Sequence, residues 1–197
     1  TNDFYVNDDS TAGDVYTIVA GDDAKNGLTP ASPKRTLTNL LSTYDLDPGD
    51  TVYIDTGVYL SGARIAGTGG GADGDGTPGA PITIVGPTNG AVALFSGSGG
   101  DGFFLTNVVN VRVRALAIRG YTYGVRVLTG GGFASTNNEF RGLTVKSNVN
   151  AGINFMSANV AANRIVSNRI FGPETYGIQI YGFRNVVSNN PVIAGHV

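Results

Sequence analysis

The C-terminal half of the chain repeats one short residue pattern four times. The copies start at residues 111, 138, 163 and 185, so successive copies lie 27, 25 and 22 residues apart. Each copy has an apolar residue at its third and eighth positions and Asn or Leu at its sixth. A repeat of this length indicates a solenoid, in which every unit stacks on the unit before it.

The residue types within the repeat favour strands over helices. Apolar and polar residues alternate with a period of two, which is typical of strands with one buried face. A second alternating block follows each of the first three copies, at Gly124–Val127, Gly152–Phe155 and Gly177–Ile180. These segments are too short and too rich in Gly and Asn for ankyrin, tetratricopeptide or HEAT units, and the Leu lattice of a leucine-rich repeat is missing. We therefore predict an all-β fold, a single-stranded parallel β-helix in which the coils stack as a solenoid.

Stacking of the coils predicts which side chains become neighbours. Strands of successive coils lie about 4.8 Å apart. We expect Asn168 and Asn190 to lie one above the other at a tight corner, where their side-chain amides hydrogen-bond along the stack. Asparagine also tolerates the left-handed backbone angles of such a corner. Leu116 and Leu143 occupy the same column in earlier coils. The Asn ladder is therefore predicted for the last coils only.

Polar positions of the strands must point outward if the apolar positions point inward. One outward column is Arg112, Glu139 and Arg164, which predicts a surface ladder of ion pairs.

A second outward register predicts a carbohydrate-binding face. It holds the residues Arg126, Asn154 and Gln179, with Tyr123 and Tyr176 directly before the adjoining glycines. Arginine, amides and aromatic rings on a flat strand face suit a sugar polymer, through hydrogen bonds and ring stacking. The simpler interpretation, a solvated strand face of ordinary polar residues, stays open.

A short helix is predicted near the N-terminus. Ser32 and Pro33 have the residue types of an N-cap and a first helical position. Apolar residues then recur at helical spacing, at Leu37, Leu40, Leu41 and Tyr44. A helix just before a solenoid covers the apolar cross-section of the first coil.

The order of these N-terminal motifs resembles the cap of the pectate-lyase-like superfamily. The motifs are Phe4-Tyr5-Val6, Gly21-Asp22-Asp23, Asn26 to Pro30, Pro33, Thr36-Leu37, Pro48 to Ile54 and Gly57-Val58-Tyr59. The later Asn-x-Val-x-x-Asn and Tyr-Gly-Ile-x-Ile blocks are similar to the coils of that group. The resemblance implies a right-handed parallel β-helix of about five or six coils with a short N-terminal capping helix. We expect one continuous domain, with the cap and first coil at 1–60 and the remaining coils at 61–197.

Composition restricts the partners. The formal net charge is −2 and cysteine is absent, so we expect no nucleic-acid partner and no thiolate metal site. No apolar run is long enough for a membrane span. Asp73 and Asp75 are spaced like the start of a calcium loop, but the other ligands of such a loop are missing. We expect a solvated loop there and no cofactor.

Catalysis has few candidate residues. A polysaccharide lyase needs a base and a positive group near a uronic carboxylate, and Arg126 is the best single candidate, with Arg119 and Lys146 also placed where a groove could form. A glycosidase needs two facing carboxylates. From Phe103 onward the acids are Glu139 and Glu174, and the one histidine is His196.

Three functions stay open from the sequence. The first is a non-catalytic segment of a bacterial surface or secreted protein, extracellular or at the cell surface, that binds polysaccharide. The second is the front part of a carbohydrate-active enzyme, most plausibly a polysaccharide lyase. The third is a self-stacking fibre subunit. The last copy of the repeat stops within a coil, so further coils or a stacking subunit are expected to follow it.

Overall fold

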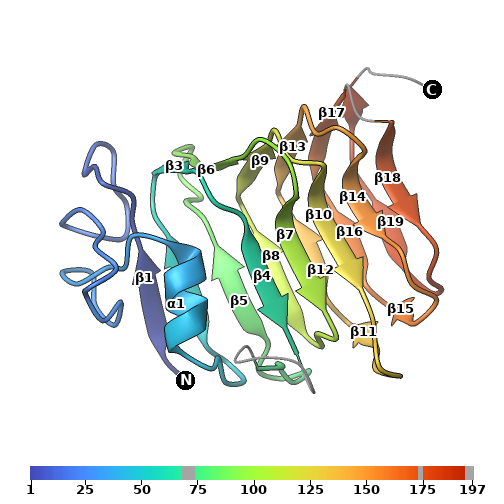
Figure 1. The fold of residues 1–197 in the computed structure, drawn as a ribbon, viewed down its shortest axis with the longest axis horizontal. Helices are drawn as coiled ribbons and strands as arrows, with labels where there is room; N and C mark the ends of the chain where they lie inside the picture. The colour runs from blue at the N-terminus through green and yellow to red at the C-terminus, as the bar shows by residue number, and fades with distance from the viewer. Residues whose placement is uncertain (68–73, 173–174, 194–197) are drawn as a thin grey trace.

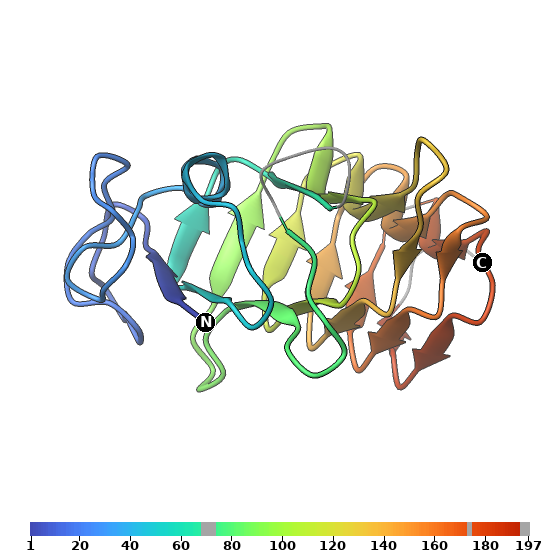
Figure 2. The ribbon, with the colours of Figure 1, turned by 90° about the horizontal axis from the view of Figure 1, so that it is seen from below.

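Three parallel sheets wind around one common axis (Figure 1). They enclose one apolar core. The computed structural model describes residues 1–67, 74–172 and 175–193. Figure 2 shows the coils following one another along the long axis, from the N-terminal cap toward the C-terminus. Every strand pair between successive coils is parallel, including Ile165 with Val187. The predicted parallel β-helix is confirmed.

The sheets are named here A, B and C. Sheet A consists of β1 (Asp3–Val6), β2 (Thr51–Ile54), β5 (Ile82–Val85), β8 (Val111–Arg114), β12 (Glu139–Arg141), β16 (Arg164–Val166) and β19 (Val186–Ser188). Sheet B consists of β3 (Gly57–Tyr59), β6 (Ala93–Ser96), β9 (Ala117–Arg119), β13 (Thr144–Lys146), β17 (Arg169–Phe171) and β20 (Val192–Ile193). Sheet C consists of β4 (Ala63–Ala66), β7 (Asp101–Thr106), β10 (Tyr123–Leu128), β14 (Ala151–Phe155) and β18 (Tyr176–Ile180). A short extra pair is formed by β11 (Ser135–Thr136) and β15 (Val160–Ala161).

Inward side chains of the three sheets form the core. Val113, Phe140 and Ile165 follow one another in sheet A and are fully buried. Aromatic rings stack in the same way, with the Tyr59 and Phe95 ring centroids 5.0 Å apart. Because each inward residue packs on its equivalent in the next coil, the period-two pattern of the sequence becomes a set of continuous apolar columns.

Helix α1 (Leu37–Thr43) begins later than predicted. Its N-cap is Thr36, whose side-chain oxygen accepts a hydrogen bond from the backbone N–H of Asn39. The predicted start at Ser32 and Pro33 was wrong, because Lys34 is held in extended backbone beside β1, with a bridge to Val6. The buried face of the helix, Leu37, Leu40 and Leu41, is as expected.

The outer edge of β1 is covered by the cap itself. The N–H groups of Tyr5 and Asn7 donate to the carbonyl oxygens of Gly27 and Lys34, and the Lys34 N–H donates to the Tyr5 carbonyl. An edge strand with its backbone groups already paired cannot extend the sheet with another chain. The N-terminal end of sheet A is therefore closed.

Two Asn ladders hold the corners of the coils. Asn190 Oδ1 accepts bonds from the backbone N–H and side-chain amide of Asn168, both at 2.9 Å, which confirms the predicted ladder. The left-handed residues at this corner are the preceding ones, for example Ser167 (φ 57°) and Asn189 (φ 53°). Asn168 and Asn190 do not themselves adopt the left-handed angles that they were expected to tolerate, because the residue before each of them takes that conformation at the corner.

The second ladder was not predicted. It joins Asn138, Asn163 and Asn185 at the corner before sheet A, with Asn138 and Asn163 fully buried. The signal was present in the sequence, since these residues are the first position of the repeat.

Within the part of the chain that the structure describes, no helix has the length and apolar character needed to cross a bilayer.

Candidate functional site

The predicted carbohydrate-binding residues lie together on the outer face of sheet C. Arg126 pairs in register with Asn154, and Asn154 with Gln179. Tyr123 and Tyr176 both pair with Ala151, one on each side of it. The two tyrosines are therefore two coils apart, with a small residue between them.

Arg126 is held by both charge and aromatic contacts. Its Nη1 lies 3.6 Å from Asp101 Oδ2. Its guanidinium carbon lies 4.7 Å from the ring centroid of Tyr123 and 6.0 Å from that of Phe104. Burial raises the pKa of Asp101, while Arg126 acts in the opposite direction and lowers it. Arg126 is thus fixed as a cation on the sheet, with its side chain partly exposed.

Asn154 has a different environment from the solvated one expected of an outward polar residue. It is fully buried, and its side-chain amide donates to Gln179 Oε1. Its position between the longer side chains of Arg126 and Gln179 explains the burial. Tyr176 is half exposed, and Tyr123 accepts a hydrogen bond from the Asn150 amide through its hydroxyl. The surface open to a ligand is therefore formed by the tyrosines, Arg126 and Gln179.

Two members of this column were missed from the sequence. Phe104 pairs with Arg126, and Arg64 pairs with Phe104. The Arg64 guanidinium carbon lies 5.6 Å from the Phe104 ring centroid. Alignment of Phe103-Phe104-Leu105 with Val125-Arg126-Val127 would have found Phe104, whereas Arg64 precedes the recognisable repeats. The column Arg64, Phe104, Arg126, Asn154 and Gln179 extends over five successive strands.

The column predicted on sheet A has the expected register but different ion pairs. Glu139 pairs in register with Arg112 and Arg164. Its carboxylate contacts Arg164 Nε at 3.9 Å, and it accepts from Arg114 Nε at 3.0 Å. The predicted Arg112–Glu139 pair was wrong, because the diagonal Arg114 reaches the carboxylate instead.

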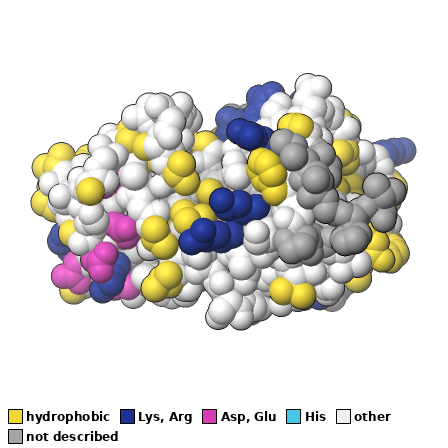
Figure 3. All heavy atoms as spheres, turned by 90° about the horizontal axis from the view of Figure 1, so that it is seen from above, with side chains coloured by type: hydrophobic (Ala, Val, Ile, Leu, Met, Phe, Trp, Pro, Cys, Tyr) yellow, Lys and Arg dark blue, Asp and Glu magenta, His cyan; other side chains and the backbone are white. Residues whose placement is uncertain are grey.

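Arg119 and Lys146 do not share a groove with Arg126. They lie on sheet B, at the ends of β9 and β13, and pair in register with each other. Viewed from above, Lys and Arg side chains gather over the middle of the molecule, and most of the visible Asp and Glu side chains lie at the N-terminal end (Figure 3).

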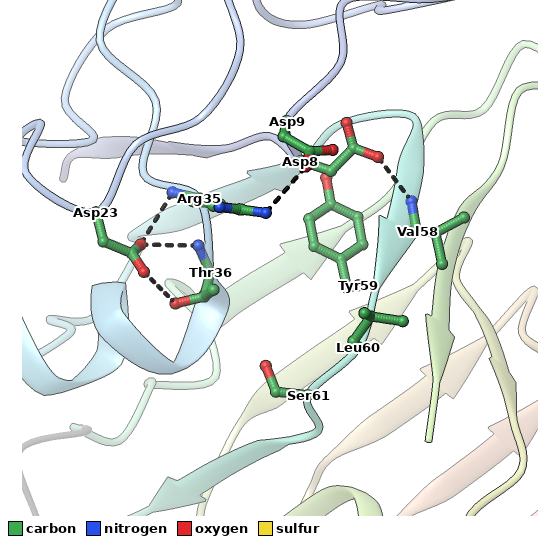
Figure 4. Close-up of a pocket in the computed structure, with 9 residues that line it drawn as sticks. All are labelled: Asp8, Asp9, Asp23, Arg35, Thr36, Val58, Tyr59, Leu60 and Ser61. Atoms are coloured by element: carbon green, nitrogen blue, oxygen red, sulfur yellow. Dashed lines mark hydrogen bonds and ion pairs between the residues drawn. The ribbon is translucent and has the colours of Figure 1, made fainter. Parts of the chain in front are cut away.

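A hollow of about 430 Å³ lies between the cap and the start of sheet B (Figure 4). Its carboxylates already have partners. Asp23 accepts from the backbone N–H groups of Arg35 and Thr36, Asp9 pairs with Arg35 at 2.9 Å, and Asp8 accepts from the Val58 N–H. The Asp8 contact attaches the cap to β3, and the contacts of Asp9 and Asp23 lie within the cap.

Asp101 and Glu139 do not face one another, because they lie on different sheets. Asp101 belongs to sheet C and Glu139 to sheet A. Glu174 and His196 lie outside the described residues. Over residues 1–67, 74–172 and 175–193 no group of three His, Cys, Asp or Glu could hold a metal ion. Asp75 accepts a hydrogen bond from the Val109 N–H, and Asp73 lies outside the described residues.

Three solved structures share this architecture. An alginate lyase from Paenibacillus sp. has a TM-score of 0.65 at 18% identity, and the match covers 80% of this chain and 56% of that one. A rhamnogalacturonan lyase has a TM-score of 0.70 at 15% identity, covering 100% and 53%. A pectate lyase, Pel9A, has a TM-score of 0.56 at 16% identity, covering 95% and 46%. The chain thus spans about half the length of each structure, and the likeness concerns the fold.

The fold and its ladders define the chain as a right-handed parallel β-helix protein, as predicted. A family model described as "Periplasmic copper-binding protein (NosD)" matches residues 48–196. The chain belongs to the NosD family. A search of curated proteins found no significant match.

Proposed function

We propose that this chain is a non-catalytic segment of an exported bacterial protein that binds polysaccharide along sheet C. The observation that carries the proposal is the register of the sheet C column, in which charged, aromatic and amide side chains follow one another over five strands. A solenoid keeps such a face straight and rigid, so its side chains are preorganised for a linear polymer.

The exposed groups suit sugar rings. Tyr123 and Tyr176 lie two coils apart on either side of Ala151, which is about 10 Å at the usual strand spacing. Their rings offer apolar faces on which sugar rings stack. Arg126 and Gln179 lie beside them and supply hydrogen bonds to hydroxyl groups.

The environment of Arg126 favours binding over catalysis. A base must accept a proton, whereas an arginine guanidinium offers five N–H donors and no acceptor. Fixed as a cation, Arg126 is suited to hold a polar or acidic sugar. The lyase hypothesis therefore ranks second.

The self-stacking hypothesis ranks third. Head-to-tail growth of identical subunits requires a free strand edge at each end. The edge of β1 is covered by its backbone hydrogen bonds with Gly27 and Lys34. This closed edge argues against a fibre built by strand pairing.

The family description supports an exported protein, since it names a periplasmic one. We propose that the chain acts outside the cytoplasm, in the periplasm or at the cell surface.

The family description also names copper binding, which the side chains of this chain do not support. Cys, Met and His are the side chains that select copper, and the chain has no Cys, one Met and one His. These residues do not fit a copper site, and the proposed function does not use the metal.

We expect Tyr176→Ala and Arg126→Ala each to weaken binding of the whole chain to its polysaccharide by about tenfold. The reason is the loss of one ring contact or one charged hydrogen-bond donor, each contributing roughly 1–2 kcal/mol. Isothermal titration calorimetry against a panel of neutral and acidic polysaccharides measures the change.

Arg141→Ala is the matched control, because Arg141 is an exposed arginine on sheet A. It should bind as the unmodified chain does, and circular dichroism should be the same for all variants. Equal affinity of the two sheet C variants and the unmodified chain would refute the proposed site. Release of unsaturated, ultraviolet-absorbing products that Arg126→Ala abolishes would place the lyase hypothesis first.

A further inference from the structure

Charge is divided unevenly along the chain. Residues 1–60 contain ten Asp and three Lys or Arg, whereas residues 103–197 contain two Glu and nine Lys or Arg. The net charge of −2 is therefore the sum of opposite contributions, from an acidic cap and from basic coils. On sheet A, Glu139 offsets part of the positive charge through Arg114 and Arg164.

Sheet B has no such compensation. Its outward cations are Arg119, Lys146 and Arg169, from three successive strands. The described strands of sheet B contain no acidic residue, and none of the four ion pairs found among the described residues involves these cations.

Arg119 and Lys146 are direct neighbours in register, in adjacent coils. Like charges placed opposite one another destabilise a sheet. Arg119 Nε donates to Ser96 Oγ at 3.1 Å, which is a neutral partner and leaves the charge in place. A negative group bound between the two cations would remove their repulsion.

The surface beside Lys146 and Arg169 is hollowed. Thr144, Lys146, Ser147, Arg169 and Phe171 line a depression of about 340 Å³. A second depression of about 490 Å³ shares Thr144 and Arg169 with the first and continues past Ala117 toward Val92. Because strand order in sheet B follows β17, β13, β9 and β6, the two depressions run along the axis of the solenoid.

We propose that the two depressions on sheet B together form a second binding site, for an acidic polysaccharide. Arg119 and Lys146 follow the coil spacing in one register, and Arg169 lies one coil further, opposite Thr144 and two residues away from that register. The three cations are thus spread along and across this surface, which complements a linear chain that bears carboxylates at intervals. Phe171, over which the Arg169 guanidinium lies at 5.3 Å, adds an aromatic surface for a sugar ring. Three cations are too few for strong binding to a nucleic acid, whose affinity depends on many phosphate contacts.

The test compares charge removal on two sheets. Arg119→Gln/Lys146→Gln removes the like-charged pair, and Arg112→Gln/Arg141→Gln removes the same charge from sheet A. The whole chain and both double variants are titrated with alginate fragments, and with the same fragments after reduction of their carboxyl groups. The sheet B variant should bind alginate at least about tenfold more weakly, and the sheet A variant should bind within about twofold of the unmodified chain.

Two further results are expected. Raising the salt concentration should weaken alginate binding by the unmodified chain, because the contact is electrostatic. The urea midpoint of the sheet B variant should be unchanged or higher, since the variant removes a repulsion. If Arg119 and Lys146 had only a structural role, their replacement would instead lower the urea midpoint.

The proposal fails if both double variants lose affinity equally, or if the reduced fragments bind as tightly as alginate. Equally tight binding of a 30-nucleotide single-stranded DNA at the same salt concentration would also overturn it, in favour of a nucleic-acid partner. The outcome is separate from that at sheet C, because Tyr176→Ala leaves the sheet B cations in place.

Discussion

Asp55→Ala is expected to lower the free energy of unfolding by about 3–4 kcal/mol. Asp55 is fully buried, where the first coil meets the cap. Its carboxylate accepts from the backbone N–H groups of Val15, Tyr16 and Thr17 at 2.7–2.9 Å, and from the Thr17 hydroxyl at 2.8 Å. Alanine would leave these donors without an acceptor. Urea denaturation followed by circular dichroism measures the loss.

Asp9→Ala is the control for this prediction. Asp9 also lies in the cap, but its carboxylate is exposed and pairs with the exposed Arg35. We expect a change below about 1 kcal/mol, as for other surface ion pairs. Similar losses for the two variants would contradict the assignment of Asp55 as the anchor of the cap.

Asn163→Ala is expected to lower the free energy of unfolding by about 2–4 kcal/mol. Asn163 Oδ1 accepts from the backbone N–H and amide of Asn138, and its own amide donates to Ser135 O and Asn185 Oδ1. The substitution leaves the buried Asn138 N–H and the Ser135 carbonyl without this partner, and Asn185 Oδ1 keeps only the bond from the Asn163 backbone N–H. Several unpaired groups are more costly than the loss of a single bond. Urea denaturation again provides the measurement.

Asn159→Ala is the matched control, since Asn159 is an exposed asparagine in the turn before β15. Its replacement should change the stability by less than about 0.5 kcal/mol. If Asn163→Ala had an effect as small as this, the ladder would be a consequence of the fold and not a source of its stability.

Much of the coil geometry was accessible from the sequence. The repeat placed Ile165 beside Val187 and Asn168 beside Asn190, and both pairs are observed. These predictions succeeded because the spacing between equivalent apolar residues equals the length of one coil. The start of α1 was mispredicted because Pro33 suits both a helix start and extended backbone, and pairing with β1 decided between them.

The candidate site was only partly accessible. The register of Arg126, Asn154 and Gln179 follows from the repeat. The contact of Arg126 with Asp101 does not, because Asp101 lies in an earlier coil whose repeat is poorly marked. The functional roles of these residues stay predictions until binding is measured.

Residue spacing alone predicts that this chain stacks short strands in coils, because alternation and repeat length act locally and recur along the chain. Which charges meet became visible only in the folded chain. Glu139 takes Arg114 rather than Arg112, and Arg119 and Lys146 lie on a different sheet from Arg126. The physical reason is that charge pairing depends on side-chain reach and on which side of a corner a residue lies, and neither is encoded in residue spacing alone.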